Sequence, residues 1–86
     1  MNASFTKAFN KQFKKLPAKQ QAKAQTAVIL FLEHPEAPSL CNHALTGEWS
    51  SYRSISAGGD LRLHFKLIDD STVLFVAVGT HSHLYK

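Results

Sequence analysis

The sequence predicts an α+β domain in which an N-terminal helical hairpin packs on a small antiparallel sheet of three or four strands. Apolar residues recur every three or four positions over residues 5–32, which is the spacing of one helix face. After residue 48, stretches that alternate in polarity are separated by short turns, which is typical of strands. Neighbouring strands joined by short turns pair as an antiparallel meander. Because the chain has only 86 residues, we expect residues 1–86 to form one domain.

Two helices are expected in the first 33 residues. Thr6 can cap the first helix, over residues 7–15, whose apolar stripe is Phe5, Phe9, Phe13 and Leu16. Pro17 suits the first turn of a second helix, because its ring fixes φ and its missing N–H would have no partner there. We expect that helix to end near Glu33, and its approximate stripe consists of Ala18, Ala22, Gln25, Ile29 and Leu32.

Three strands are expected in the second half of the chain. The first covers residues 49–56 and is followed by a turn in which Gly58 and Gly59 supply positive φ angles. The third, over residues 72–78, is apolar on both faces, which indicates a central strand. Residues 79–85 are expected to leave this strand as a short tail.

The middle strand, residues 60–67, alternates strictly between apolar and ionisable residues. Leu61, Leu63, Phe65 and Leu67 fall on one side, and Asp60, Arg62, His64 and Lys66 fall on the other. Successive side chains of a strand point to opposite faces, so one face is expected to pack and the other to be open. An acid, a guanidinium and an imidazole in one row are groups that phosphate chemistry requires.

The charge of the chain favours an anionic partner. The formal net charge is +4, six of the eight lysines lie in residues 7–23, and both arginines lie in the second half. Such a balance suits nucleic acid or an acidic protein. A single cysteine, Cys41, excludes an intrachain disulfide and a cysteine-built zinc site. No apolar run is long enough to span a membrane and no signal core is present, so a cytoplasmic protein is expected.

A ribonuclease that needs no metal is compatible with the candidate residues. It requires a base for the 2′-OH, an acid for the leaving 5′ oxygen and cations for the phosphate. Candidate acids and bases are His43, Asp60, His64, His81 and Tyr85. Arg53, Arg62, His64, Lys66 and Tyr52 are candidates for contacting the RNA substrate. For any one of these residues alone, an ordinary surface role explains its presence at least as well as a functional role. The pair His81-x-His83 is a weak metal signal, so no metal or cofactor is expected.

Three stretches of the sequence resemble one known family. They are Leu45-x-Gly47-x-Trp49-x-x-Tyr52-Arg53, Gly59-Asp60-Leu61-Arg62-Leu63-x-Phe65 and Val78-Gly79-Thr80-His81-x-x-Leu84-Tyr85. Together with Phe5-Thr6-Lys7-Ala8-Phe9 and Leu16-Pro17, they look like the YafQ branch of the RelE/ParE-like toxins of bacterial toxin–antitoxin pairs. The N-terminal strand usual in that family has only residues 1–5 left for it here.

The resemblance implies a toxin that enters the ribosomal A site and cuts mRNA without a metal, by 2′-OH attack that gives a cyclic phosphate. It also implies a cognate acidic antitoxin, and operator DNA as a partner only of the toxin–antitoxin complex. By position, the family's functional residues correspond to His43, Asp60, His81 and Tyr85. Arg62 corresponds to a phosphate-stabilising arginine of the wider RelE group, and Arg53 lies where RelE-like members carry a lysine.

Two serines depart from the family pattern. Ser54 and Ser56 occupy positions where YafQ-like toxins carry an aspartate and a histidine, and serine is a poor base unaided. His64 lies on the same strand face as Asp60 and Arg62 and is a candidate replacement. Two other functions stay open: a catalytically weakened module that acts through antitoxin or operator binding, and a ParE-type gyrase inhibitor.

Overall fold

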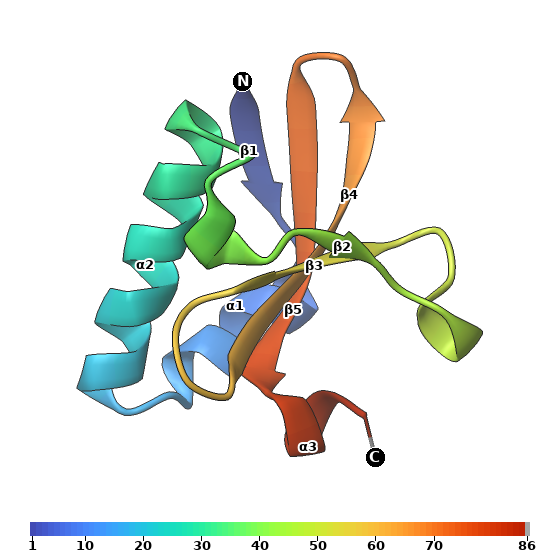
Figure 1. The fold of residues 1–86 in the computed structure, drawn as a ribbon. Coiled ribbons are helices and arrows are strands. Elements are labelled where there is room, and N and C mark those ends of the chain that lie inside the picture. Colours follow the sequence, from blue (N-terminus) through green and yellow to red (C-terminus); the bar gives the residue numbers. More distant parts are fainter. Residues whose placement is uncertain (86) are drawn as a thin grey trace.

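The computed structural model describes residues 1–85, which form one five-stranded sheet with helices against it (Figure 1). The elements, in chain order, are β1 (Asn2–Phe5), α1 (Lys7–Lys14), α2 (Ala18–Glu33), η1 (Pro38–Leu40), β2 (His43–Ala44), η2 (Gly47–Trp49), β3 (Arg53–Ser56), β4 (Leu61–Asp69), β5 (Thr72–Thr80) and α3 (His81–Leu84). The elements η1 and η2 are single 3₁₀ turns. The α+β class expected from the sequence is confirmed.

The sheet is larger than expected and is not purely antiparallel. Its strand order is β1-β5-β4-β3-β2, and β1 runs parallel to β5, with Asn2 opposite Thr72 and Phe5 opposite Phe75. The expectation of three or four antiparallel strands, with an N-terminal strand nearly absent, was therefore wrong. The four residues of β1 are mostly exposed and show no alternation of polar and apolar residues that would predict a strand. They form a strand because β5 supplies their hydrogen-bonding partners. With β1 on one side and β4 on the other, β5 is a central strand.

Helix α1 begins as expected but packs differently. Thr6 caps it, because the Thr6 hydroxyl oxygen accepts a hydrogen bond from the Phe9 amide at 3.1 Å. Beyond β1, the helix covers the edge of β5, where the Val78 amide donates to the Gln12 side-chain oxygen at 2.9 Å. Covering an open strand edge in this way prevents pairing with another chain. Since α1 lies chiefly along β5 and α2 along β4, the two do not form a distinct helical hairpin.

The core lies between α2 and the adjacent face of the sheet. Phe31 of α2 contacts Phe65 of β4 and Phe75 of β5, with ring centroids 4.7 and 5.9 Å apart. The buried residues of α2 are Ala24, Ala27 and Phe31. The stripe expected for this helix was wrong, and Ile29 is exposed. The end of α2 is apolar on nearly all sides, so spacing alone left its orientation ambiguous.

Strand β4 follows the expected alternation at its start only. Leu61, Leu63 and Phe65 are buried, whereas Leu67 is exposed because the end of the β4–β5 hairpin extends beyond the core. Residues 79–85 do not form a simple tail. Thr80 caps the short helix α3, and its hydroxyl oxygen accepts from the His83 amide at 3.3 Å. A polar Thr-His-Ser-His stretch of four residues is too short for a helical period to be recognised.

Candidate functional site

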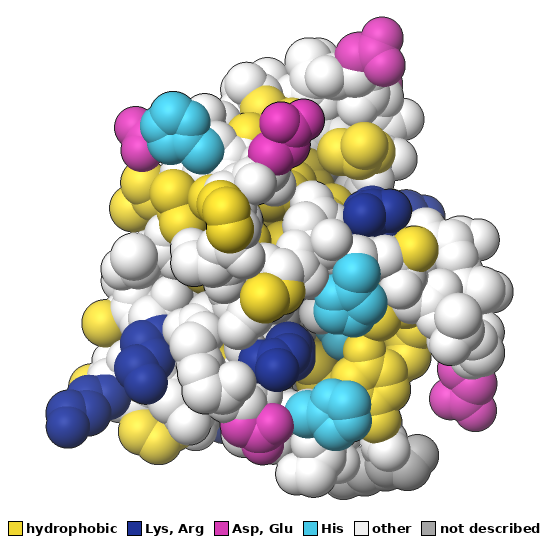
Figure 2. Space-filling model, in the orientation of Figure 1, with side chains coloured by type: hydrophobic (Ala, Val, Ile, Leu, Met, Phe, Trp, Pro, Cys, Tyr) yellow, Lys and Arg dark blue, Asp and Glu magenta, His cyan; other side chains and the backbone are white. Residues whose placement is uncertain are grey.

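The candidate site lies on the sheet face that points away from α2. His43 of β2 is opposite Ser54 of β3, and Ser54 is opposite His64 of β4. Directly opposed residues project their side chains from the same face, so these three form a row across the sheet. Phe65, the next residue after His64, points to α2, which places the row on the other face. Figure 2 shows histidine side chains beside exposed hydrophobic atoms on this part of the surface.

Arg62 lies in the neighbouring row, opposite Ser56 of β3. Its Nη1 donates to the Ser56 hydroxyl at 3.3 Å, to the Gly59 carbonyl at 2.9 Å and to the Leu61 carbonyl at 3.0 Å. These three bonds all use one nitrogen, so Nε and Nη2 remain for a phosphate. The β3–β4 turn therefore fixes a guanidinium at the rim of the face, in the form suited to bidentate phosphate binding.

Helix α3 brings two further candidates to the same place. The His81 amide donates to the Asp60 carbonyl at 3.0 Å, which ties the start of α3 to the β3–β4 turn. His81 and Tyr85 follow one another at a spacing of four residues, and their rings lie 4.5 Å apart. Gly79 allows α3 to pack closely, since a Cβ there would lie 3.4 Å from both His83 and Leu84. The fold thus gathers Asp60, His81 and Tyr85 from segments far apart in sequence.

His64 forms the buried floor of the site. It is fully buried, and its Nε2 lies 3.1 Å from the Tyr85 hydroxyl oxygen, within hydrogen-bond distance. Burial is the main cause that lowers the pKa of His64 to about 4, and the neighbouring His43 and His81 lower it further. His64 is therefore neutral at pH 7. It cannot touch RNA directly in this structure, so its expected role as a substrate-binding residue does not fit its burial.

His43 presents one ring nitrogen to solvent. Its Nδ1 lies 2.8 Å from the Cys41 carbonyl oxygen, which can only accept a hydrogen bond. The Nδ1 atom therefore carries a proton, and in the neutral ring of this exposed residue Nε2 keeps a free lone pair. A neutral imidazole in this tautomer is equipped to act as a general base.

Aromatic side chains extend the site along the face. Trp49 contacts the His64 ring edge-on at 4.4 Å and the Tyr52 ring at 5.6 Å. The Lys66 ammonium lies 5.6 Å from the centre of the Tyr52 ring. Tyr52 and Lys66 are thus at the far end of the face from His81, where they can contact a base or a phosphate of bound RNA.

Arg53 does not join the group. It is opposite Phe65 on the α2 side of the sheet, and its Nε donates to the Asn42 side-chain oxygen at 2.8 Å. Sequence reasoning missed two residues that shape the site: Trp49, which covers His64, and Ser54, which lies between His43 and His64. The Leu-x-Gly-x-Trp motif was the available signal for Trp49.

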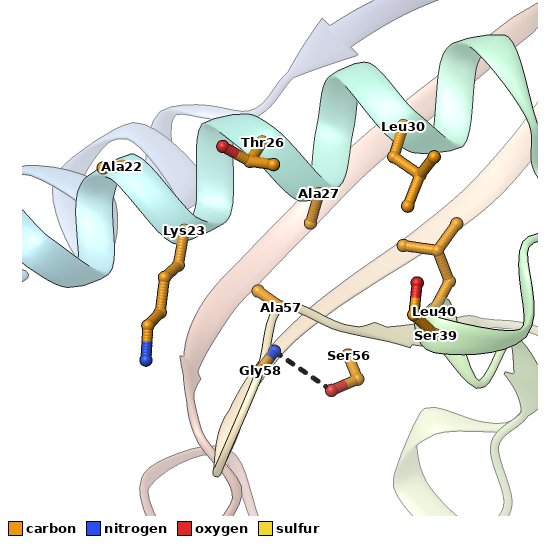
Figure 3. Close-up of a pocket in the computed structure, with 10 residues that line it drawn as sticks. All are labelled: Ala22, Lys23, Thr26, Ala27, Leu30, Ser39, Leu40, Ser56, Ala57 and Gly58. Atoms are coloured by element: carbon orange, nitrogen blue, oxygen red, sulfur yellow. Dashed lines mark hydrogen bonds between the residues drawn. The ribbon is translucent and has the colours of Figure 1, made fainter.

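A separate groove of about 380 Å³ lies between α2, η1 and the β3–β4 turn (Figure 3). Its lining is mostly apolar, and Lys23 is the one charged residue among those that line it. Because it contains none of the histidines, we place the site on the open face of the sheet instead. Within residues 1–85, no three His, Cys, Asp or Glu side chains are close enough to hold a metal ion. None of the helices in that range combines the length and hydropathy of a membrane span.

The sheet has five strands of mixed direction, and α1 and α2 lie in the chain between β1 and the other four strands. Together with an open face that carries histidines, this arrangement defines a RelE-like toxin fold. The family model for the YafQ toxin of bacterial type II toxin–antitoxin systems matches residues 1–86. The chain therefore belongs to the YafQ family and is a toxin of a bacterial type II toxin–antitoxin system. The family resemblance expected from the sequence is confirmed.

Solved structures agree with this assignment. YafQ from Escherichia coli has a TM-score of 0.83 and 22% identity, over 99% of this chain and 98% of that chain. The toxin in the Escherichia coli DinJ–YafQ toxin–antitoxin complex has a TM-score of 0.80 and 22% identity, over 99% and 97%. A conserved hypothetical protein from Helicobacter pylori has a TM-score of 0.69 and 28% identity, over 99% of each chain. No curated protein matches the sequence.

Proposed function

We propose that this toxin is a ribosome-dependent, metal-independent endoribonuclease that cuts mRNA in the ribosomal A site and so blocks translation. The observation that carries the proposal is the grouping of His43, Arg62, His81 and Tyr85 on one face of the sheet. These groups can supply a base, a phosphate-binding cation and an acid, the requirements for cleavage by the neighbouring 2′-OH.

In the proposed reaction, the 2′ oxygen attacks the adjacent phosphorus while the bond from phosphorus to the 5′ oxygen breaks. His43 takes the 2′-OH proton at its free Nε2, and a group of α3, His81 or Tyr85, gives a proton to the leaving 5′ oxygen. Arg62 binds the phosphate as negative charge increases on it. Asp60, in the β3–β4 turn beside the start of α3, orients His81. The products are a cyclic phosphate and a 5′-hydroxyl end.

We propose further that residues 1–86 act as one domain in the cytoplasm, with ribosome, mRNA and a cognate acidic antitoxin as partners. The structure of the related DinJ–YafQ complex supports an antitoxin partner, and a net charge of +4 favours an acidic one. Operator DNA would be bound only by the toxin–antitoxin complex. A groove beside α1 is lined by Lys11, Lys15 and His83, which gives ribosomal RNA a basic surface close to α3.

The test is to map mRNA ends by primer extension in a reconstituted translation system, for the wild type and for His43→Ala. New ends should appear with the wild type at ribosome-occupied codons, and they should vanish when ribosomes are omitted. The variant lacks the proposed base and should cut at least about 100-fold more slowly. Equal cutting of naked RNA would contradict ribosome dependence.

A catalytically weakened module is the second candidate. The supporting observation is that neither serine offers a base: Ser54 is fully buried, and Ser56 accepts a hydrogen bond from Arg62. This candidate predicts intact mRNA and normal growth on expression, with antitoxin binding retained. Blocked growth with intact mRNA would instead indicate gyrase inhibition of the ParE type.

A further inference from the structure

We infer that His64 is a positioning residue that holds Tyr85 with its hydroxyl proton turned outward, so that Tyr85 is the acid for the leaving 5′ oxygen. This inference rests on the proposed nuclease function and assigns an acid that the function itself leaves open between His81 and Tyr85. His64 is not itself a catalytic residue, because it has no exposed surface from which to touch substrate.

The surroundings of His64 fix its ring. Trp49 packs edge-on against it at 4.4 Å, and the Tyr85 ring also packs against it, with ring centroids 5.3 Å apart. Ser54 is its neighbour across the strand pair. A ring enclosed in this way cannot turn to follow a substrate, so whichever atom it presents to Tyr85 stays in place.

The tautomer of His64 follows from its hydrogen bonds. A neutral imidazole has one N–H, and it is neutral here because burial lowers its pKa to about 4. Its Nδ1 has no hydrogen-bond partner among the described residues, whereas Nε2 has the Tyr85 oxygen at 3.1 Å. Either tautomer leaves Nδ1 without a partner, but a buried N–H donor without a partner is rarer in proteins than a buried acceptor without one. We therefore assign the proton to Nε2, from which it is donated to the Tyr85 oxygen.

This arrangement decides what Tyr85 can do. Its oxygen accepts from His64, and its own O–H has no acceptor among residues 1–85, so it can point to bound RNA. Tyr85 is 37% exposed, and burial raises its pKa while Arg62 lowers it, so the hydroxyl is protonated at pH 7. When the bond to the 5′ oxygen breaks, the Tyr85 proton passes to that oxygen. The phenolate that remains is stabilised by the His64 N–H and by Arg62, and it regains its proton from water.

A double-mutant cycle on mRNA cleavage tests the coupling. The rates of the wild type, His64→Leu, Tyr85→Phe and the double variant are measured at saturating ribosome–mRNA complex. We expect Tyr85→Phe to lower the rate about 100-fold and His64→Leu about tenfold. The double variant should be no slower than Tyr85→Phe alone, and His64→Gln, which keeps an N–H donor, should recover part of the rate. Multiplying effects would overturn the inference.

A titration keeps the inference testable if no variant, or not even the wild type, cleaves mRNA. In a Tyr52→Phe background Tyr85 is the one remaining tyrosine, and its ionisation is followed by near-ultraviolet absorbance. Loss of a donor to the Tyr85 oxygen destabilises the phenolate, so His64→Leu should raise the pKa of Tyr85. An unchanged or lowered pKa would overturn the assignment. Wild-type protein that leaves mRNA intact, beside a raised pKa, would refute the nuclease function but not the positioning of Tyr85.

Discussion

Lowering the pH from 7 to 5 is expected to destabilise the fold by about 2 kcal/mol through His64 alone. The pKa of His64 is lowered from 6.5 to about 4 in the folded chain, first by burial and then by His43 and His81. Between these two values the unfolded chain binds a proton that the folded chain does not. Stability is therefore greatest above about pH 6.5, and it decreases as the pH falls towards 4.

Urea unfolding at pH 7, 6 and 5 measures this effect. For a domain of this size the slope is about 1 kcal/mol per molar urea, so the midpoint should fall by up to about 2 M between pH 7 and pH 5. His64→Leu removes the titrating group, and its midpoint should change much less over the same range. His34→Gln, which alters an exposed histidine elsewhere, should retain the wild-type dependence. The reasoning is refuted if His64→Leu and the wild type lose stability equally.

Three further substitutions test particular contacts. Thr80→Ala removes the cap of α3 and should lower the free energy of unfolding, measured with urea, by about 1 kcal/mol. The rate of mRNA cleavage should also fall, because His81 and Tyr85 move. Unchanged cleavage would show that the cap does not position them. Ser54→Ala removes a buried hydroxyl that has no partner within residues 1–85 and should leave the unfolding free energy equal or up to about 1 kcal/mol higher; a marked loss would reveal a hydrogen bond that the structure lacks. Arg62→Lys keeps the charge but loses the bidentate hydrogen bonding of a guanidinium, so the rate of mRNA cleavage should fall about tenfold or more with little change in stability. Cleavage at the wild-type rate would exclude Arg62 as the phosphate ligand.

The alternation of residues 60–66 was the most reliable sequence signal. It identified the buried face of β4 and placed Arg62 and His64 on the opposite face. It did not reveal that His64 is buried, because the cover comes from Trp49 and Tyr85, which lie 15 and 21 residues away in sequence. A one-dimensional pattern reports which face a side chain occupies, and tertiary contacts decide whether that face is open.

The elements that sequence reasoning missed are the ones that depend on distant partners. β1 is stabilised by hydrogen bonds to β5, and α3 by its cap and its contact with the Asp60 carbonyl. Arg53 was expected to contact RNA on the same face as the other candidates, yet strand alternation from Ser54 already places it on the other face. The positions matched through the family resemblance are those that the fold does bring together: Asp60, His81 and Tyr85 at one end of the face, with His43 across the sheet.

The parallel pairing of β1 with β5 also affects when the candidate site can form during synthesis of the chain. Residues 2–5 leave the ribosome first, but their partners, residues 72–75, are made more than 60 residues later. The central strand and α3, which carries His81 and Tyr85, are therefore missing from every shorter nascent chain. Such contacts between distant parts of a chain also slow folding. No nascent chain can therefore contain the candidate site until β5 and α3 have been made.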